Sequence, residues 1–133
     1  MSTLSVGTIK SASSAAPVFQ NSSGTEKGQL VKAWINFDGT GTVSIRDSYN
    51  ISSLTDISTG IYQISYTNAF SNNDYAVTAS AIEDYASIES RSPRIAGPTR
   101  SAPATGSVHI ATWATDNNAY DVEECHVIVI GAN

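Results

Sequence analysis

The stretch that decides the fold is VKAWINFDGTGTVSIRDSY, residues 31–49. Its first half alternates apolar and more polar residues with a period of two, which is the spacing of a β-strand. Asp38 and Gly39 then precede a second alternating run, from Thr42 to Tyr49. Because glycine accepts a positive φ, Asp-Gly between two such runs predicts a hairpin. The segment therefore predicts a pair of antiparallel strands.

The same period recurs along the rest of the chain, whereas no stretch carries a helical period with caps at both ends. Residues 50–60 are rich in turn formers and are expected to form a connection. The alternation predicts further strands over residues 61–67, 75–81, 107–115 and 120–130, with a shorter run around 85–90. The apolar segment CHVIVIG near the end is typical of a central strand. Together these features predict an all-β chain with an antiparallel β-sandwich or jelly-roll-like domain.

Residues 1–28 differ from the rest of the chain. They hold Ser, Thr, Ala and Gly with isolated apolar residues, among them Leu4, Val6 and Ile9, and no sustained period. Such a segment buries too little apolar surface to offset its ordering entropy. We expect an extended N-terminal arm for attachment or trimerisation, followed by a β-sandwich domain over residues 29–133. A linker, a strand completed by another chain and a flexible tail are the alternatives.

Composition and charge exclude several classes of function. Only 14% of the residues are charged and the net charge is −5, so no basic field is available to hold nucleic acid. No apolar run approaches the roughly 20 residues that span a bilayer. A single cysteine allows neither an internal disulfide nor a cysteine metal cluster. The first residues show no basic leader followed by an apolar stretch, so we expect synthesis in a reducing cytosol without a secretion signal.

The histidines and the cysteine do not assemble a site in the sequence. His109 and His126 fall on the last two expected strands, and their rings approach each other if those strands pair. Two histidines are too few for a closed zinc site, and no carboxylate lies at metal-ligand spacing beside either one. Cys125 is next to His126, and adjacent strand residues point to opposite faces. An ion held by both histidines at a trimer axis is the alternative left open.

The acidic residues show no constellation either. Glu83-Asp84 and Glu123-Glu124 are adjacent pairs, whose members face apart on a strand. A glycosidase needs two carboxylates about 5–10 Å apart across a groove, and no such pair is evident. We therefore expect a protein with no catalytic, cofactor-binding or metal-binding residues.

Residues 91–106, RSPRIAGPTRSAPATG, form a separate kind of segment. They contain three of the four prolines and three of the seven basic residues, Arg91, Arg94 and Arg100. Proline lacks the N–H of a strand ladder, so the segment predicts a long exposed loop or an excursion at a sheet edge. Its gathered positive charge makes the three arginines candidates for receptor binding. The alternative is ordinary pairing with carboxylates of the same or a neighbouring subunit.

The region between residues 31 and 66 resembles a segment of tail-fibre and related virion appendage proteins of marine and cyanobacterial bacteriophages. The matching pattern is KAW-NF-GTGTV-IR-SYN, followed by a YAV at Tyr75. The similarity covers about the first 80 residues; the chain departs from the pattern at Ser58, where the family more often has glycine, and in the Pro/Arg segment. The module is structural and transfers no catalytic residue.

This resemblance implies an exposed, homotrimeric β-domain on a phage particle. It implies a non-enzymatic short tail fibre or fibre tip that attaches the virion to a host surface protein or glycan, with the arm held by other virion proteins. The alternatives are a capsid-decorating or head-fibre protein and a sugar-cleaving fibre enzyme. Trp34, with Leu4, Val6 and Ile9, is the candidate subunit interface. The alternative for Trp34, which faces away from Ile35 and Phe37, is a second covered face within one sandwich.

Overall fold

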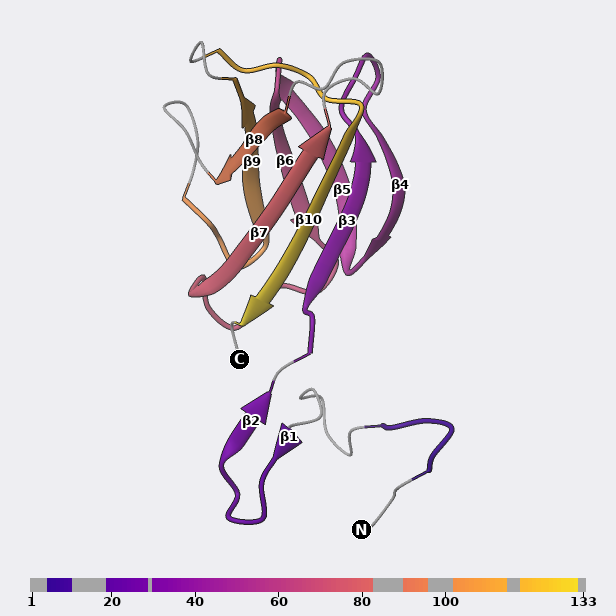
Figure 1. The fold of residues 1–133 in the computed structure, drawn as a ribbon, viewed down its shortest axis with the longest axis vertical. Coiled ribbons are helices and arrows are strands. Elements are labelled where there is room, and N and C mark those ends of the chain that lie inside the picture. The colour runs from indigo at the N-terminus through magenta and orange to yellow at the C-terminus, as the bar shows by residue number, and fades with distance from the viewer. Residues whose placement is uncertain are drawn as a thin grey trace. The chain divides into compact units, whose positions relative to one another are not determined.

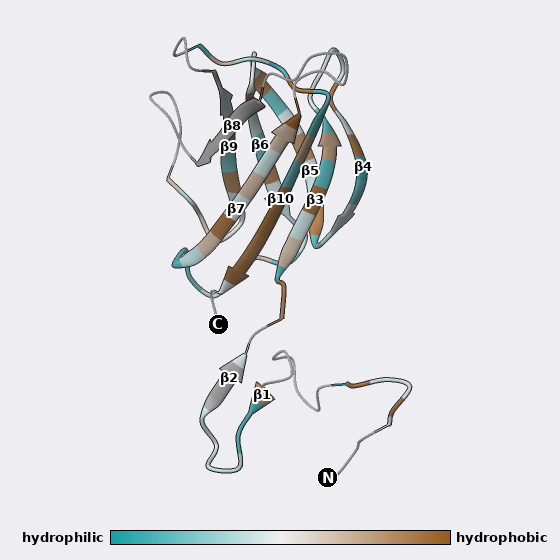
Figure 2. Cartoon of the chain, in the orientation of Figure 1, coloured by the Kyte–Doolittle hydropathy of each residue, from teal (hydrophilic) through white to brown (hydrophobic). Residues whose placement is uncertain are grey.

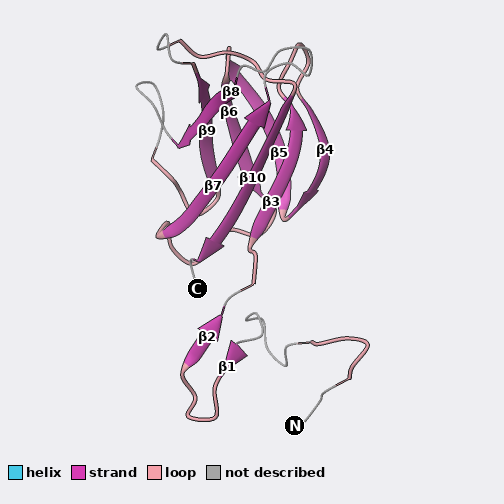
Figure 3. Cartoon of the chain, in the orientation of Figure 1, coloured by secondary structure: helices cyan, strands magenta, loops and turns pink. Residues whose placement is uncertain are grey.

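The computed structural model describes residues 5–10, 19–28, 30–82, 90–95, 102–114 and 118–131, with the backbone alone at 26–27 and 90–95. All regular structure in these ranges is β-strand (Figure 3). Within them, no helix is long and apolar enough to cross a membrane. The chain divides into two compact units, Met1–Leu30 and Val31–Asn133.

The first unit contains a hairpin that the sequence analysis did not anticipate. Strand β1, Phe19–Gln20, pairs antiparallel with β2, Glu26–Gly28. The side-chain Oδ1 of Asn21 accepts hydrogen bonds from the backbone N–H groups of Ser23, at 3.2 Å, and of Thr25, at 2.8 Å. These bonds organise the turn locally, as Asn side chains commonly do. The Asn-Ser-Ser-Gly run was the available signal.

The second unit is one antiparallel sheet of eight strands in the order β4-β3-β10-β7-β8-β9-β6-β5. It folds into two layers: β4, β3, β10 and β7 form one, β9, β6 and β5 form the other, and β8 pairs with both (Figure 1). The predicted antiparallel β-sandwich is confirmed. The strand bounds are β3, Ala33–Asp38; β4, Ser44–Tyr49; β5, Ile51–Ser58; β6, Ile61–Tyr66; β7, Tyr75–Ile82; β8, Ser90–Ile95; β9, Ser107–Trp113; and β10, Glu124–Gly131.

The connections between strands follow Greek-key rules. Strands β7, β8 and β9 form a meander, and β10 returns to pair with β7 on its outer side. Strand β6 pairs with β9 at the other end of the meander. Because of this arrangement, β9 and β10 lie in different layers, although they follow each other in the sequence.

The core lies between the two layers, where alternate residues of each strand meet. Strand β3 buries Ala33, Ile35 and Phe37, as the period of two predicted, whereas Val31 precedes the strand and is exposed. Strand β10 lies between β3 and β7 and is the most continuously apolar strand (Figure 2), so the predicted central strand is confirmed. The buried cluster is completed by Tyr62, Ile64, Tyr66, Val108, Ile110, Val122, Cys125, Val127 and Val129.

The expectation of a turn-rich connection over residues 50–60 was wrong. Strand β5 occupies Ile51–Ser58 and pairs with β6 at the edge of its layer. The register shifts between Ile51 and Ser53, so the half-buried residues of β5, Ile51 and Leu54, are three positions apart. A β-bulge therefore removed the period of two on which the prediction depended.

The Pro/Arg segment was only partly predicted. Residues Ser90–Ile95 form β8, where a long exposed loop or an excursion at a sheet edge was expected. Ser90 and Arg91 pair with β7, and the register then passes to β9, with Pro93 opposite Thr112. Pro93 thus lies past the paired end of β7, where a missing N–H is tolerated. The short run expected around residues 85–90 falls outside the described residues except at Ser90.

Candidate functional site

The outward face of the β4-β3-β10-β7 layer carries a group of interacting polar side chains. On β3 the residues that alternate with the core are Trp34, Asn36 and Asp38. The register places Ile128 of β10 opposite Trp34, and His126 opposite Asn36. Paired residues of antiparallel strands point to the same face, so these side chains form adjacent rows.

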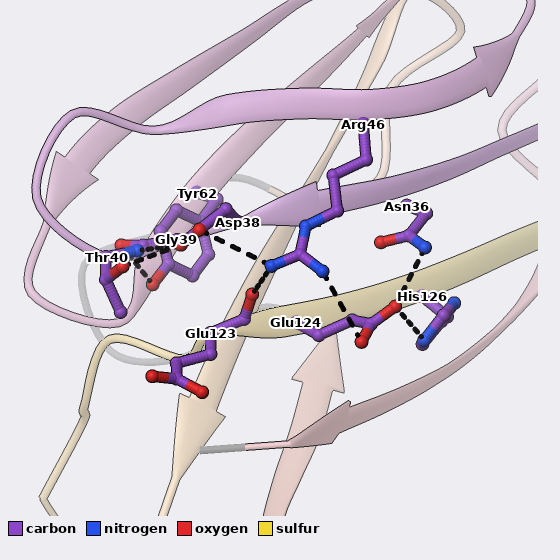
Figure 4. A network of polar contacts seen from close by, with 9 residues as sticks. All are labelled: Asn36, Asp38, Gly39, Thr40, Arg46, Tyr62, Glu123, Glu124 and His126. Carbon is purple, nitrogen blue, oxygen red and sulfur yellow. Dashed lines mark hydrogen bonds and ion pairs between the residues drawn. The ribbon is translucent and has the colours of Figure 1, made fainter. Parts of the chain in front are cut away.

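A β-bulge brings two charged residues of β4 to the same face. Asp47 pairs with Asn36 and Ile45 pairs with Phe37, which leaves Arg46 as the additional residue. A bulge of this kind re-aims side chains that a regular ladder would alternate. The expected separation of Arg46 from Asp47 is therefore absent, and Arg46 reaches over the outward face of β3 and β10 (Figure 4).

Arg46 joins three strands or their connections through its guanidinium group. One terminal nitrogen donates to the backbone carbonyl of Glu123, at 2.6 Å, and lies 3.4 Å from Oδ2 of Asp38. The other terminal nitrogen lies 3.6 Å from Oε2 of Glu124. The planar, always charged guanidinium suits such multiple contacts. Because the arginine side chain is 38% exposed, each ion pair contributes little to stability.

Glu124 links Arg46 to the next row of the face. Its Oε1 accepts a hydrogen bond from the Asn36 amide, at 2.9 Å, and lies 3.1 Å from Nε2 of His126 (Figure 4). A carboxylate thus lies beside His126, a contact that the sequence analysis did not predict. Residues two apart on a strand share a face, and the Glu124-Cys125-His126 spacing was the signal available in the sequence.

Two acidic residues that the sequence analysis did not connect, Asp38 and Glu124, meet at Arg46. They lie far apart in the sequence, and the pairing of β3 with β10 brings both onto Arg46. Hydrogen bonds from the side chain and backbone of Thr40 lower the pKa of Asp38, and Arg46 lowers it further. The cluster is thus an ion-pair network built on an ionised carboxylate.

A hollow of about 280 Å³ opens beside this network on the same face. It is lined from both strands of the β3–β10 pair and from β4. The lining residues are Trp34, Ile35, Asn36, Asp47, His126, Val127 and Ile128. Aromatic, aliphatic and polar side chains thus converge on one concave surface, which is the usual composition of a small-ligand site.

The two histidines do not meet. His126 lies on β10, while His109 lies on β9 of the other layer, opposite Gln63 of β6. The predicted approach depended on pairing of these strands, which the structure does not contain. No group of three or more metal-ligating side chains occurs within the described ranges. Cys125 is buried beneath the face that His126 occupies, as the sequence predicted.

The remaining predicted site residues are dispersed. Arg91 and Arg94 belong to β8, of which only the backbone is described, and Arg100 lies outside the described residues. Val6 and Ile9 of the first unit are exposed, and Leu4 lies outside the described residues. Receptor binding by the arginines and subunit contact through these apolar residues stay predictions.

Trp34 is half-buried on the outward face, because the other layer packs against Ala33, Ile35 and Phe37. The alternative of a second covered face within one sandwich stays a prediction, as does the use of Trp34 as a subunit interface.

Comparison with known proteins gives one finding about the fold. No protein-family model and no curated protein matches the sequence. Among solved structures, the chain is similar to the phiAB6 tailspike, described in complex with three-repeated oligosaccharides of Acinetobacter baumannii surface polysaccharide. The TM-score is 0.55 with 14% identity over 92% of this chain. The chain spans 30% of the tailspike's length, and the likeness shows a shared fold.

Proposed function

We propose that this chain is a non-enzymatic virion structural protein, a short trimeric tail fibre or fibre tip that mediates attachment to the host. The observation that carries the proposal is the likeness in fold to a phage tailspike over 92% of the chain. The resemblance of the region between residues 31 and 66 to phage tail-fibre and appendage proteins supports it independently, because it rests on residue identities.

The two units of the chain fit this role. In the first unit Val6, Ile9 and Phe19 expose much of their apolar surface. Such residues gain burial when sister chains or another virion protein cover them. We propose that this unit serves as the attachment or trimerisation arm, and that the β-sandwich is the exposed domain on the surface of the virion.

The polar network supports a binding protein better than a sugar-cleaving enzyme. A glycosidase general acid needs a raised pKa, whereas the pKa of Asp38 is lowered by Thr40 and Arg46. Glu124 is engaged by Arg46, Asn36 and His126 and is mostly buried. Neither carboxylate is arranged as a proton donor. We therefore propose attachment without cleavage, and a host surface glycan as the receptor class, in line with the oligosaccharide named for the tailspike.

Two measurements test the proposal. Light scattering coupled to gel filtration should give three times the mass of one chain; a stable monomer at micromolar concentration contradicts the trimer. Immunogold labelling of intact particles should mark the tail. Labelling of the head would replace the tail fibre by a capsid-decorating protein, and unlabelled particles would contradict a virion protein altogether. Release of reducing ends from host polysaccharide would overturn the non-enzymatic assignment.

A further inference from the structure

The hollow on the outward face of β3, β4 and β10 combines two kinds of surface. Trp34 and Ile128 face each other across the β3–β10 pair and form an apolar row. Asn36 and His126 form the adjacent row, with Asp47 next to Asn36 on β4. The indole supplies a flat apolar surface beside groups that exchange hydrogen bonds.

One polar atom of this lining lacks a hydrogen-bond partner. The side-chain amide N–H of Asn36 donates a hydrogen bond to Glu124. An ionised carboxylate can only accept, so the amide carbonyl Oδ1 of Asn36 points away from Glu124. That oxygen is buried and has no partner among the described residues. An unsatisfied buried acceptor costs about 1–3 kcal/mol. Because this oxygen is buried, a ligand in the hollow does not reach it, and the exposed carboxylate of Asp47 is the acceptor that a ligand hydroxyl group can contact.

The charges around the hollow select against an anionic ligand. Asp47 lines the hollow and Glu124 lies beside it, in a chain with a net charge of −5. No lysine or arginine is among the residues that line the hollow, and Arg46 beside it is already shared among Asp38, Glu123 and Glu124. An acidic ligand would meet repulsion from Asp47 without a lysine or arginine in the lining to pair with. A neutral polyhydroxyl molecule meets acceptors for its hydroxyl groups and an aromatic surface for its C–H face.

We infer that this hollow binds a neutral sugar residue of a surface glycan, with Trp34 as the stacking platform and Asp47 as the hydroxyl acceptor. The volume of about 280 Å³ is near the lower end for small-molecule pockets, roughly 300 Å³, and suits one small unit of a chain. The inference rests on the proposed attachment function and gives it a location and a ligand class. Glycan binding at Trp34 excludes the use of the same side chain as a subunit contact, because a covered Trp34 could not reach a ligand.

The test uses the full chain on an array printed with neutral and acidic oligosaccharide units of bacterial surface polysaccharides. We expect binding to at least one neutral unit, and a loss of affinity of about tenfold or more in Trp34→Ala and in Asp47→Ala. Trp34→Phe keeps an aromatic surface and should retain part of the affinity. Ile57→Ala removes an apolar side chain that is 46% exposed on β5, in the other layer, and is the control. Circular dichroism verifies the fold of each variant.

Three outcomes would overturn the inference: binding to acidic units alone, unchanged affinity in folded Trp34→Ala, and no binding of the full chain to any neutral unit. A Trp34→Ala chain that keeps its affinity but loses its oligomeric mass in light scattering assigns the face to contact between copies. A chain that immunogold places on the tail and that binds no neutral unit keeps the proposed function and loses this site.

Discussion

At the scale of single residues, Gly60 shows how one position fixes the approach of two segments. Its φ of +65° lies in the left-handed region, and its N–H donates to Oδ1 of Asp121, at 2.7 Å. The hydroxyl of Tyr62 donates to the same carboxylate, at 3.1 Å. The turn between β5 and β6 is thereby joined to the segment that leads into β10, which belongs to the other layer.

Gly60→Ala should strongly destabilise the domain. A Cβ there would lie 2.5 Å from the backbone nitrogen of Tyr120. Gly41 is the matched control, because its φ is +58° and a Cβ there meets nothing within 4 Å. We expect Gly41→Ala to lower the free energy of unfolding by about 1 kcal/mol, and Gly60→Ala by about 3 kcal/mol or more. Equal losses in urea denaturation would contradict the close approach.

Cys125 predicts a pH dependence of stability. Burial raises the pKa of its thiol from 9.0 to about 12. Between these values the unfolded chain loses the proton while the folded chain keeps it, so the unfolded state binds fewer protons and stability falls as pH rises. One such group contributes a slope of about 1.4 kcal/mol per pH unit.

Cys125→Ala removes this contribution to the slope. The variant should be less stable than the parent at pH 8, because it leaves a cavity, and the difference should narrow from pH 9 to 12. Burial also raises the pKa of Tyr62 and Tyr66. The loss of stability that these tyrosines cause at high pH is common to the parent and to Cys125→Ala. Urea denaturation at each pH measures the difference in free energy of unfolding between the parent and Cys125→Ala. A difference that stays constant with pH would contradict a raised pKa of the Cys125 thiol in the folded chain.

At the scale of elements, the period of two located strands wherever the ladder is regular. It placed the buried faces of β3, β6, β7 and β9 because each of these strands has core on one side. It failed at β5 and at β4, where the pairing with the neighbouring strand contains a bulge. A bulge is decided by pairing with a neighbouring strand, and a single strand's sequence carries little sign of it.

The arginines of the Pro/Arg segment belong to this scale, because β8 carries two of them at the junction of the layers. If these arginines bind the receptor, replacing Arg91, Arg94 and Arg100 together by Ser should abolish adsorption of the protein to host cells. The triple variant should unfold at the same urea concentration as the parent. Unchanged adsorption would assign the arginines to contacts within the protein.

At the scale of the whole molecule, the division at residue 30 makes the roles of the two units separable. All members of the buried core cluster lie in the second unit. A chain lacking residues 1–28 should therefore keep a cooperative unfolding transition. If the arm trimerises the protein, light scattering should give the mass of one chain for this truncation and of three for the parent. A trimeric truncation would place the subunit interface on the sandwich.

The sequence by itself determined the all-β class, the β3–β4 hairpin and the central position of CHVIVIG. These features depend on local periodicity, glycine conformation and continuous apolar character, which are properties of short segments. Only the tertiary structure decided that β9 and β10 lie in different layers, that Asp38, Arg46 and Glu124 meet, and that Trp34 borders a hollow. Those outcomes depend on which strands pair and in what register. For strands that are distant in the sequence, the packing of their buried faces determines the pairing.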